Sequence, residues 1–139
     1  MLFRSPFEER PELEEIAAAN DIIIITLVSP VSEGRIGTIA KDAKGFIYCV
    51  SSLGVTGVRK DFDTDFGEFI ASINKASSVP KAVGFGISSP QQAEEMKKYF
   101  DGVIVGSAIV KIVEESSNQD EAVNNVGRYV EELRNALDR

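Results

Sequence analysis

The sequence predicts an α/β domain with a parallel sheet, because two hydrophobic periods alternate along its 139 residues. Short runs that are apolar at every position alternate with longer stretches in which apolar residues recur every three or four positions. The first pattern is typical of strands covered on both faces, and the second of the helices that cover them. Four strand–helix units follow one another, whereas a closed (β/α)8 TIM barrel has eight and needs roughly 250 residues. We therefore expect one domain, residues 1–139, built as half of such a barrel with four parallel strands and flanking helices.

The N-terminal part of the chain predicts a helix, a strand, a second helix and a second strand. Pro11–Asn20 has its apolar residues on one face, and its proline suits a first helical turn. Ile22–Leu27 is apolar on both faces, as a covered parallel strand must be. Gly34–Ala43 again shows helical spacing, and Phe46–Val50 is the next short apolar run.

The C-terminal part continues the alternation. A helix with the buried stripe Phe66, Phe69, Ile70 and Ile73 precedes the third strand, Lys81–Gly84. Ser89–Gln92 reads as a capping box with proline at the first helical position, and Gly102–Val105 is the fourth strand. Gly106 and Ser107 open a short helix that reaches about Glu115, and residues 116–121 are polar enough for a loop. The last helix carries an apolar stripe at Val123, Val126, Val130, Leu133 and Leu137.

Composition excludes several classes of function. The net charge of −7 argues against nucleic acid or an anionic membrane as a partner, because no basic patch is present. The chain has no histidine and one cysteine, Cys49, so we expect no metal site, no intrachain disulfide and no other cofactor. Cys49 lies in an apolar run and is interpreted as a core residue. No signal peptide or membrane-spanning run is seen, and the expected location is the cytoplasm.

Three glycine-rich turns follow three consecutive strands. They are Gly54–Gly57, Gly84–Ser88 and Gly106–Ala108. Glycine lets backbone N–H groups approach an anion, and a helix that starts at Ser107 adds its own free N–H groups. None of the turns contains lysine or arginine, so the site would use backbone donors and the Ser107 hydroxyl, which suits a phosphate. Each glycine alone is more often a tight turn, but three in succession match the phosphate site of β/α barrels.

At this point the sequence resembles the tryptophan synthase alpha chain family. Residues 45–59, GFIYCVSSLGVTGVR, resemble its sixth strand and sixth loop. VGFGIS at 83–88 and DGVIVGSAIV at 101–110 are similar to its seventh and eighth strands. The resemblance runs from about Pro6, near the end of the fourth strand, through the eighth helix, which is the C-terminal half of the family's barrel.

The resemblance implies a lyase of tryptophan biosynthesis, which cleaves indole-3-glycerol phosphate to indole and glyceraldehyde 3-phosphate. The positions that match its phosphate site are Gly57, Gly86, Gly106 and Ser107. The positions that match its substrate pocket and closing loop are Tyr48, Thr56, Gly84 and Phe85. For Tyr48 and Phe85, aromatic core packing is the simpler alternative.

The same resemblance implies that no catalytic residue lies in this chain. The family's proton-transferring glutamate and aspartate belong to its second strand and the following loop, which correspond to no part of these 139 residues. We therefore expect the isolated chain to be inactive, as a truncated frame or an engineered fragment would be. The alternative function is a non-catalytic half-barrel that binds phosphate or associates with itself. Expected partners are indole-3-glycerol phosphate or another phosphate ligand, a second copy in a homodimer, and a tryptophan synthase beta chain.

Overall fold

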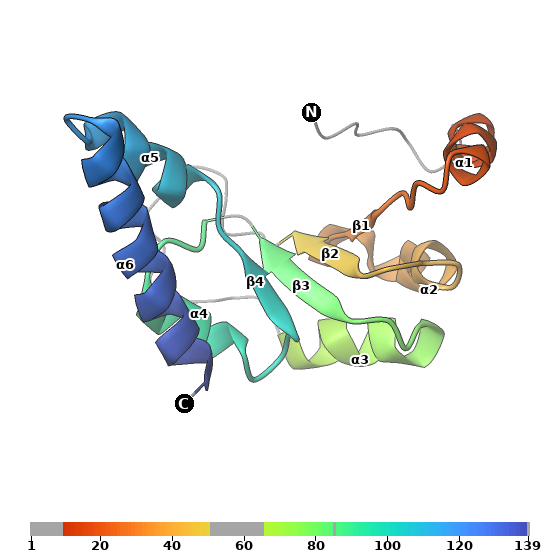
Figure 1. The fold of residues 1–139 in the computed structure, drawn as a ribbon. Coiled ribbons are helices and arrows are strands. Elements are labelled where there is room, and N and C mark those ends of the chain that lie inside the picture. The colour runs from red at the N-terminus through yellow and green to blue at the C-terminus, as the bar shows by residue number, and fades with distance from the viewer. Residues whose placement is uncertain (1–9, 51–65, 85, 139) are drawn as a thin grey trace.

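A computed structural model describes residues 10–50, 66–84 and 86–138 of the chain (Figure 1). The elements in order are α1 (Arg10–Ala19), β1 (Thr26–Val28), the 3-10 helix η2 (Pro30–Arg35), α2 (Ile36–Ala40), β2 (Ile47–Val50), α3 (Phe66–Ala76), β3 (Lys81–Gly84), α4 (Pro90–Met96), β4 (Gly102–Ile104), α5 (Ser107–Glu115) and α6 (Gln119–Asp138). None of the helices in this part of the chain is long and apolar enough to cross a membrane.

The four strands form one parallel sheet in the order β1-β2-β3-β4. Each strand is hydrogen-bonded to its neighbour in sequence, as crossover connections through helices require. Leu27 pairs with Tyr48, Tyr48 with Ala82, and Ala82 with Gly102. This register confirms the predicted four-stranded parallel sheet, with β1 and β4 at its two edges.

The two faces of the sheet have different environments. One face packs against helices, and its side chains are fully buried: Val28, Ile47, Cys49 and Val83. They contact the stripe of α3 that was predicted from spacing, together with Met96 and Phe100. The intervening residues of the opposite face are only half-buried: Leu27, Tyr48, Val50, Ala82 and Ile104. The sheet therefore has one covered face and one open face, as half of a barrel should.

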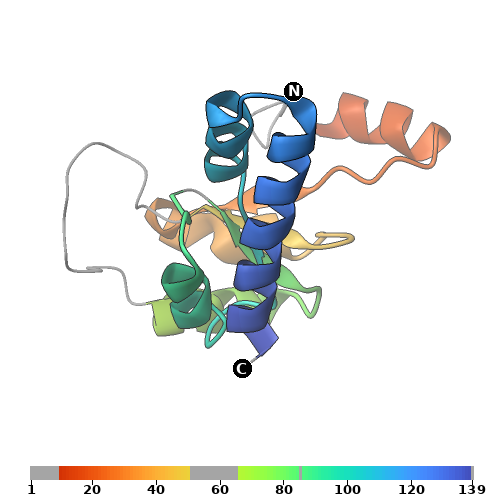
Figure 2. The ribbon, with the colours of Figure 1, turned by 60° about the vertical axis from the view of Figure 1, so that its left-hand side comes forward.

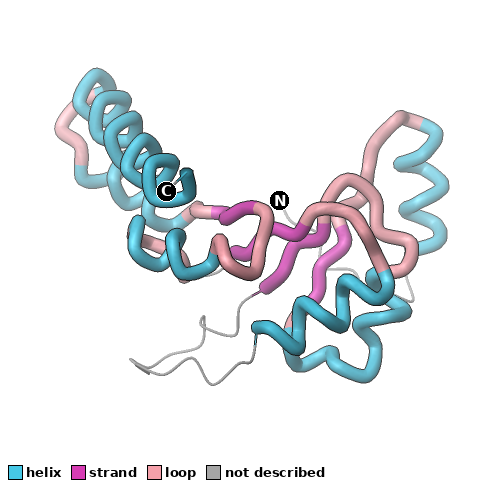
Figure 3. Tube along the Cα trace, turned by 90° about the horizontal axis from the view of Figure 1, so that it is seen from below, coloured by secondary structure: helices cyan, strands magenta, loops and turns pink. Residues whose placement is uncertain are grey.

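The helices form an arc around the sheet that remains open between α1 and α6 (Figure 3). α6 runs beside α4 and α5, at the end of the sheet that carries β4 (Figure 2). α1 lies at the other end and stands away from the sheet. Consequently, two of its predicted apolar residues, Leu13 and Ile16, are exposed, and only Ala17 of that face is buried.

Several predicted boundaries were wrong, each for a physical reason. Ile22–Leu27 was expected as a strand, but the ladder with β2 begins only at Thr26, because β2 itself starts at Ile47. The second helix begins as a 3-10 turn at Pro30, where proline suits a helix start. The last helix begins at Gln119, because Asn118 caps it: the Glu121 amide donates to Asn118 Oδ1 at 3.0 Å.

Candidate functional site

The carboxyl ends of β3 and β4 bring two of the predicted glycine turns together. Gly84 and Ile104 are paired across these strands, and each is close to the end of its strand. Gly86 follows Gly84 by two residues, and Gly106 follows Ile104 by two residues. Because parallel strands end at the same edge of a sheet, the two turns emerge side by side at the rim where β/α folds place their ligands.

The backbone at these turns has the features of an anion cradle. Gly86 has a φ of +80°, a conformation that glycine adopts readily and other residues do not. Gly106 precedes α5, and the first intrahelical bond of that helix runs from the Val110 amide to the Gly106 carbonyl at 3.1 Å. The N–H groups of the first turn, from Ser107 on, have no partner within the helix and direct a partial positive charge outward.

The space around Gly106 is open. A Cβ added to this glycine would meet no atom within 4 Å, and Gly86, Gly106 and Ser107 are all exposed. The structure therefore brings Gly86, Gly106 and Ser107 to one accessible rim. Gly57, Thr56 and Phe85 lie outside the described residues.

Tyr48 and Gly84 form a close pair on the open face of the sheet. The aromatic ring of Tyr48, on β2, extends across Gly84 on β3. A Cβ added to Gly84 would lie 2.6 Å from Cζ of Tyr48, a distance that no real contact of this kind allows. Gly84 is therefore buried under the tyrosine, and the pair places an aromatic wall below the anion turns.

Cys49 belongs to the covered side of the sheet and not to this site. Its side chain is fully buried, and burial raises the pKa of the thiol to about 12. Lys81 acts in the opposite direction on that pKa and Asp101 adds to the rise. The burial confirms the core interpretation, and the raised pKa keeps the thiol protonated at neutral pH.

The amino ends of β3 and β4 are held by polar contacts. The Lys81 amide donates to the Asp101 carboxylate at 2.8 Å, and Lys81 Nζ donates to Asn74 Oδ1 at 2.6 Å. These groups lie at the rim opposite to the glycine turns. They therefore fix the strands without entering the site.

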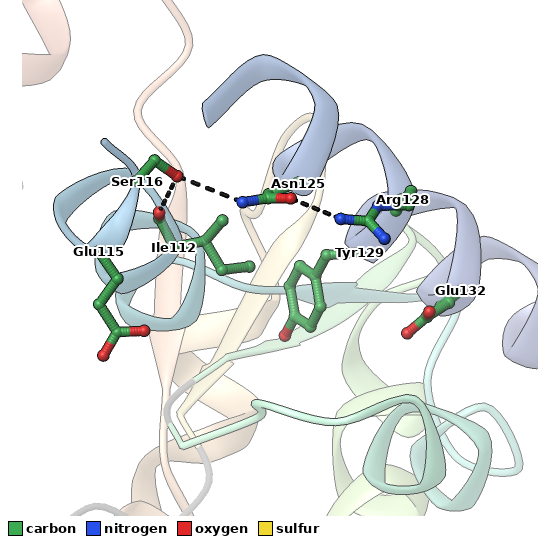
Figure 4. Close-up of a pocket in the computed structure, with 7 residues that line it drawn as sticks. All are labelled: Ile112, Glu115, Ser116, Asn125, Arg128, Tyr129 and Glu132. Atoms are coloured by element: carbon green, nitrogen blue, oxygen red, sulfur yellow. Dashed lines mark hydrogen bonds between the residues drawn. The ribbon is translucent and has the colours of Figure 1, made fainter. Parts of the chain in front are cut away.

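A hollow of about 260 Å³ between α5 and α6 was not predicted from the sequence (Figure 4). Arg128 Nη2 donates to Asn125 Oδ1 at 2.6 Å, and Asn125 Nδ2 donates to Ser116 Oγ at 3.5 Å. The Tyr129 hydroxyl is buried without a hydrogen-bond partner among the described residues, and burial raises its pKa. The only sequence signal for this network is the spacing of Asn125 and Arg128, because residues three apart lie on the same face of a helix. None of the anion-turn residues lines the hollow.

Comparison with known proteins decides the family. The family model described as "Tryptophan synthase alpha chain" matches residues 2–138, which is nearly the whole chain. The chain belongs to the tryptophan synthase alpha chain family. It is 42% identical to the tryptophan synthase alpha chain of Thermoanaerobacter sp. (strain X514) over 132 residues, which are 95% of this chain and 50% of the relative. It is 52% identical to that of Bacillus licheniformis over 114 residues, which are 82% of this chain and 43% of the relative.

Solved structures of this family agree with the fold. The alpha subunit from Campylobacter jejuni superposes with a TM-score of 0.78 at 34% identity, over 91% of this chain and 51% of that one. A chain of the tryptophan synthase a2b2 complex from Pyrococcus furiosus superposes with a TM-score of 0.76 at 32% identity, over 94% of this chain and 52% of that one. The chain thus spans about half the length of the relatives it matches. It has the C-terminal half of the tryptophan synthase alpha barrel.

Proposed function

We propose that this chain is the phosphate-holding half of a lyase that cleaves indole-3-glycerol phosphate to indole and glyceraldehyde 3-phosphate, in cytoplasmic tryptophan biosynthesis. The observation that supports the proposal most is the pair of turns after β3 and β4. Gly86 and Gly106 each follow a paired strand residue by two positions, and Ser107 is the first residue of α5. Backbone N–H groups at such a rim bind phosphate without a basic side chain.

The other substrate contacts follow from the same arrangement. Tyr48 and Gly84 form a wall on the open face below the turns, where the indole group of the substrate would lie. Gly57 and Thr56 would contribute from the turn after β2, and Phe85 from the turn after β3. No group in this chain is assigned to proton transfer.

Calorimetric titration with glycerol 3-phosphate tests the anion site. The parent chain should bind, and Gly106→Leu should lose binding because the new side chain fills the approach to the N–H groups. The open space around Gly106 means that this change should leave the fold intact. Gly37→Leu is the matched control, since Gly37 in α2 also has no atom within 4 Å of an added Cβ. Equal affinity of the Gly106→Leu variant and the parent would move the site elsewhere.

The isolated chain should not release indole. General acid–base steps contribute about 10²–10⁴-fold each, so a chain without the family's two carboxylates should match buffer in an indole-release assay. Turnover that co-purifies with the chain and is lost in Tyr48→Phe would contradict this. If no indole is released, the 139-residue chain shows the alternative function, which is phosphate binding without chemistry.

We also assign partners to this half-barrel. Within the described part of the chain, β1 and β4 are the edge strands of the sheet and its second face is only half-buried, which favours a homodimer. One of the matching structures belongs to an a2b2 complex, so a tryptophan synthase beta chain is the proposed heterologous partner.

A further inference from the structure

Among the residues that the structure describes, the segment before β1 has the features of a strand without a partner in the sheet. Ile22–Ile25 is apolar throughout, yet the ladder with β2 starts only at Thr26. Ile22 and Ile23 are 62% and 54% exposed, which is unusual for isoleucines next to a sheet. A groove of about 420 Å³ lies between this segment and α1, lined by Glu14, Ala17, Ala18, Asp21, Ile22, Ile23, Ile24, Thr26, Asp42 and Lys44. This groove faces α1 and the stretch before β2, so the edge at which a further strand would add is the opposite, outer edge of Ile22–Ile25.

The register of the sheet indicates which strand fits. In a barrel of eight strands, following the paired residues once around the barrel returns to the first strand about eight residues away, an offset called the shear. Each of two identical halves would contribute about four residues of this offset. The observed ladder leads from Leu27 through Tyr48 and Ala82 to Gly102. In a closed two-fold assembly, Gly102 would therefore pair with the residue four positions from Leu27. Four positions towards the C-terminus is Val31, which belongs to the helix η2 and cannot pair as a strand residue. Four positions towards the N-terminus is Ile23, which is therefore the expected partner of Gly102.

The side chains at this pairing are complementary in size. A shift of four residues keeps the parity of the strand, so Ile23 would face the barrel interior together with Leu27 and Gly102. Gly102 has no side chain, and an added Cβ there would have one neighbour within 4 Å, the Ala82 Cβ at 3.9 Å. The exposed isoleucine thus finds room opposite a glycine, as alternating large and small residues do inside barrels.

From these observations we infer that the outer edge of Ile22–Ile25 accepts β4 of a second copy of this chain, with Gly102 paired to Ile23 of the partner subunit. The inference rests on the proposed homodimer and specifies its register. Two such contacts close an eight-stranded barrel with a two-fold axis along it. Continued to the end of β4, the same register places Ile104 beside Ile25 of the partner subunit.

Sedimentation velocity of the 139-residue chain tests the interface. The parent should be dimeric, and Ile23→Lys should weaken association roughly a hundredfold or more, because it places an unpaired charge in the closed interior. Ile16→Lys is the matched control: Ile16 is 63% exposed on α1 and lies outside the inferred strand pairing. Its dimer should be unchanged. A monomeric parent at high micromolar concentration would overturn the inference, as would an Ile23→Lys variant that remains as dimeric as the parent.

Cross-linking tests the register directly and does not depend on how Ile23→Lys folds. Chains with Ile23→Cys are mixed with chains with Gly102→Cys and treated with a short bis-maleimide; Cys49 is buried and protonated, so it should not react. A covalent dimer of unlike chains is expected, and none when Ile16→Cys replaces Ile23→Cys. A dimer that does not cross-link would show a different interface. Glycerol 3-phosphate binding is measured on the same samples: binding without a dimer contradicts only this inference, and a cross-linked dimer without binding contradicts only the proposed function.

Discussion

At Gly84 the sequence pattern indicated a position that requires glycine, but it gave only part of the physical reason. The glycine-rich pattern indicated a backbone that approaches a ligand, and the φ of +80° at Gly86 agrees with a turn that needs glycine. The structure adds that Gly84 makes room for the ring of Tyr48 on the neighbouring strand. That requirement depends on the register of β2 against β3, which single-sequence periodicity does not contain.

Replacement of Gly84 by alanine should destabilise the domain through Tyr48. The new Cβ would lie 2.6 Å from Cζ of Tyr48, so the ring or the strand must move, which costs about 1–3 kcal/mol. The measurement is urea unfolding of Gly84→Ala, of Tyr48→Ala and of the double variant. The double variant should lose less stability than the sum of the single changes.

Gly102→Ala is the control for that experiment. It lies on the adjacent strand of the same sheet, where an added Cβ would meet only the Ala82 Cβ at 3.9 Å. Measured at a concentration at which the chains are monomeric, its stability should stay close to that of the parent. A Gly84→Ala variant as stable as Gly102→Ala, or strictly additive effects of Gly84→Ala and Tyr48→Ala, would contradict the proposed contact.

Cys49 should make stability depend on pH at high pH. Its pKa in the folded chain, about 12, is above the ordinary value of 9.0, because burial disfavours the thiolate. The unfolded chain therefore releases this proton first, and stability falls as the pH rises from about 9 towards 12, by about 1.4 kcal/mol for each unit of pKa difference. Urea unfolding of the parent and of Cys49→Ala at several pH values measures this. The difference between the two should narrow above pH 9; a constant difference would show that the thiol does not contribute.

At the scale of elements, periodicity located the α-helices and strands of the described residues but not their ends, and it did not predict η2. Ile22–Leu27 has the composition of one strand, yet only its last two residues have a partner in the sheet. The first four have no strand partner among the described residues, although the side chains of Ile23 and Ile25 lie beside Gly45. A strand assignment depends on such pairing, which the sequence of this segment alone does not show. The start of α6 was missed for a different reason: Asn118 and Glu121 have the spacing of a capping box, but the polar run was interpreted as a loop.

Asn118→Ala should weaken the start of α6. The Asn118 side chain accepts from the Glu121 amide, and the Glu121 carboxylate accepts from the Ser117 amide at 2.8 Å. Loss of such a cap costs about 1 kcal/mol. Urea unfolding should show this loss for Asn118→Ala but not for Asn124→Ala, which replaces an exposed asparagine inside the same helix by a better helix former. Equal effects of the two changes would show that the cap contributes nothing.

At the scale of the whole molecule, four strand–helix units in 139 residues were sufficient to predict half of a barrel. The alternation of two periods fixes a parallel sheet, and the length limits it to four strands. The open face of the sheet was less predictable. The strands are apolar on both faces, and this pattern does not indicate whether other residues cover the second face. Its consequence appears in the exposed residues around the edge, such as Ile22 and Ile23, which the sequence pattern interprets as core.

The central claim is that this half of the barrel holds a phosphate at the carboxyl ends of β3 and β4. Amide chemical shifts, followed by ¹H–¹⁵N NMR during titration with glycerol 3-phosphate, test it most directly. The amides of Gly86, Gly106 and Ser107 should shift together and saturate, whereas those of Lys81 and Asp101 at the opposite rim should stay in place. Saturable shifts centred on Asn125 and Arg128 in the α5–α6 hollow, or no saturable shift at the glycine turns, would contradict the account.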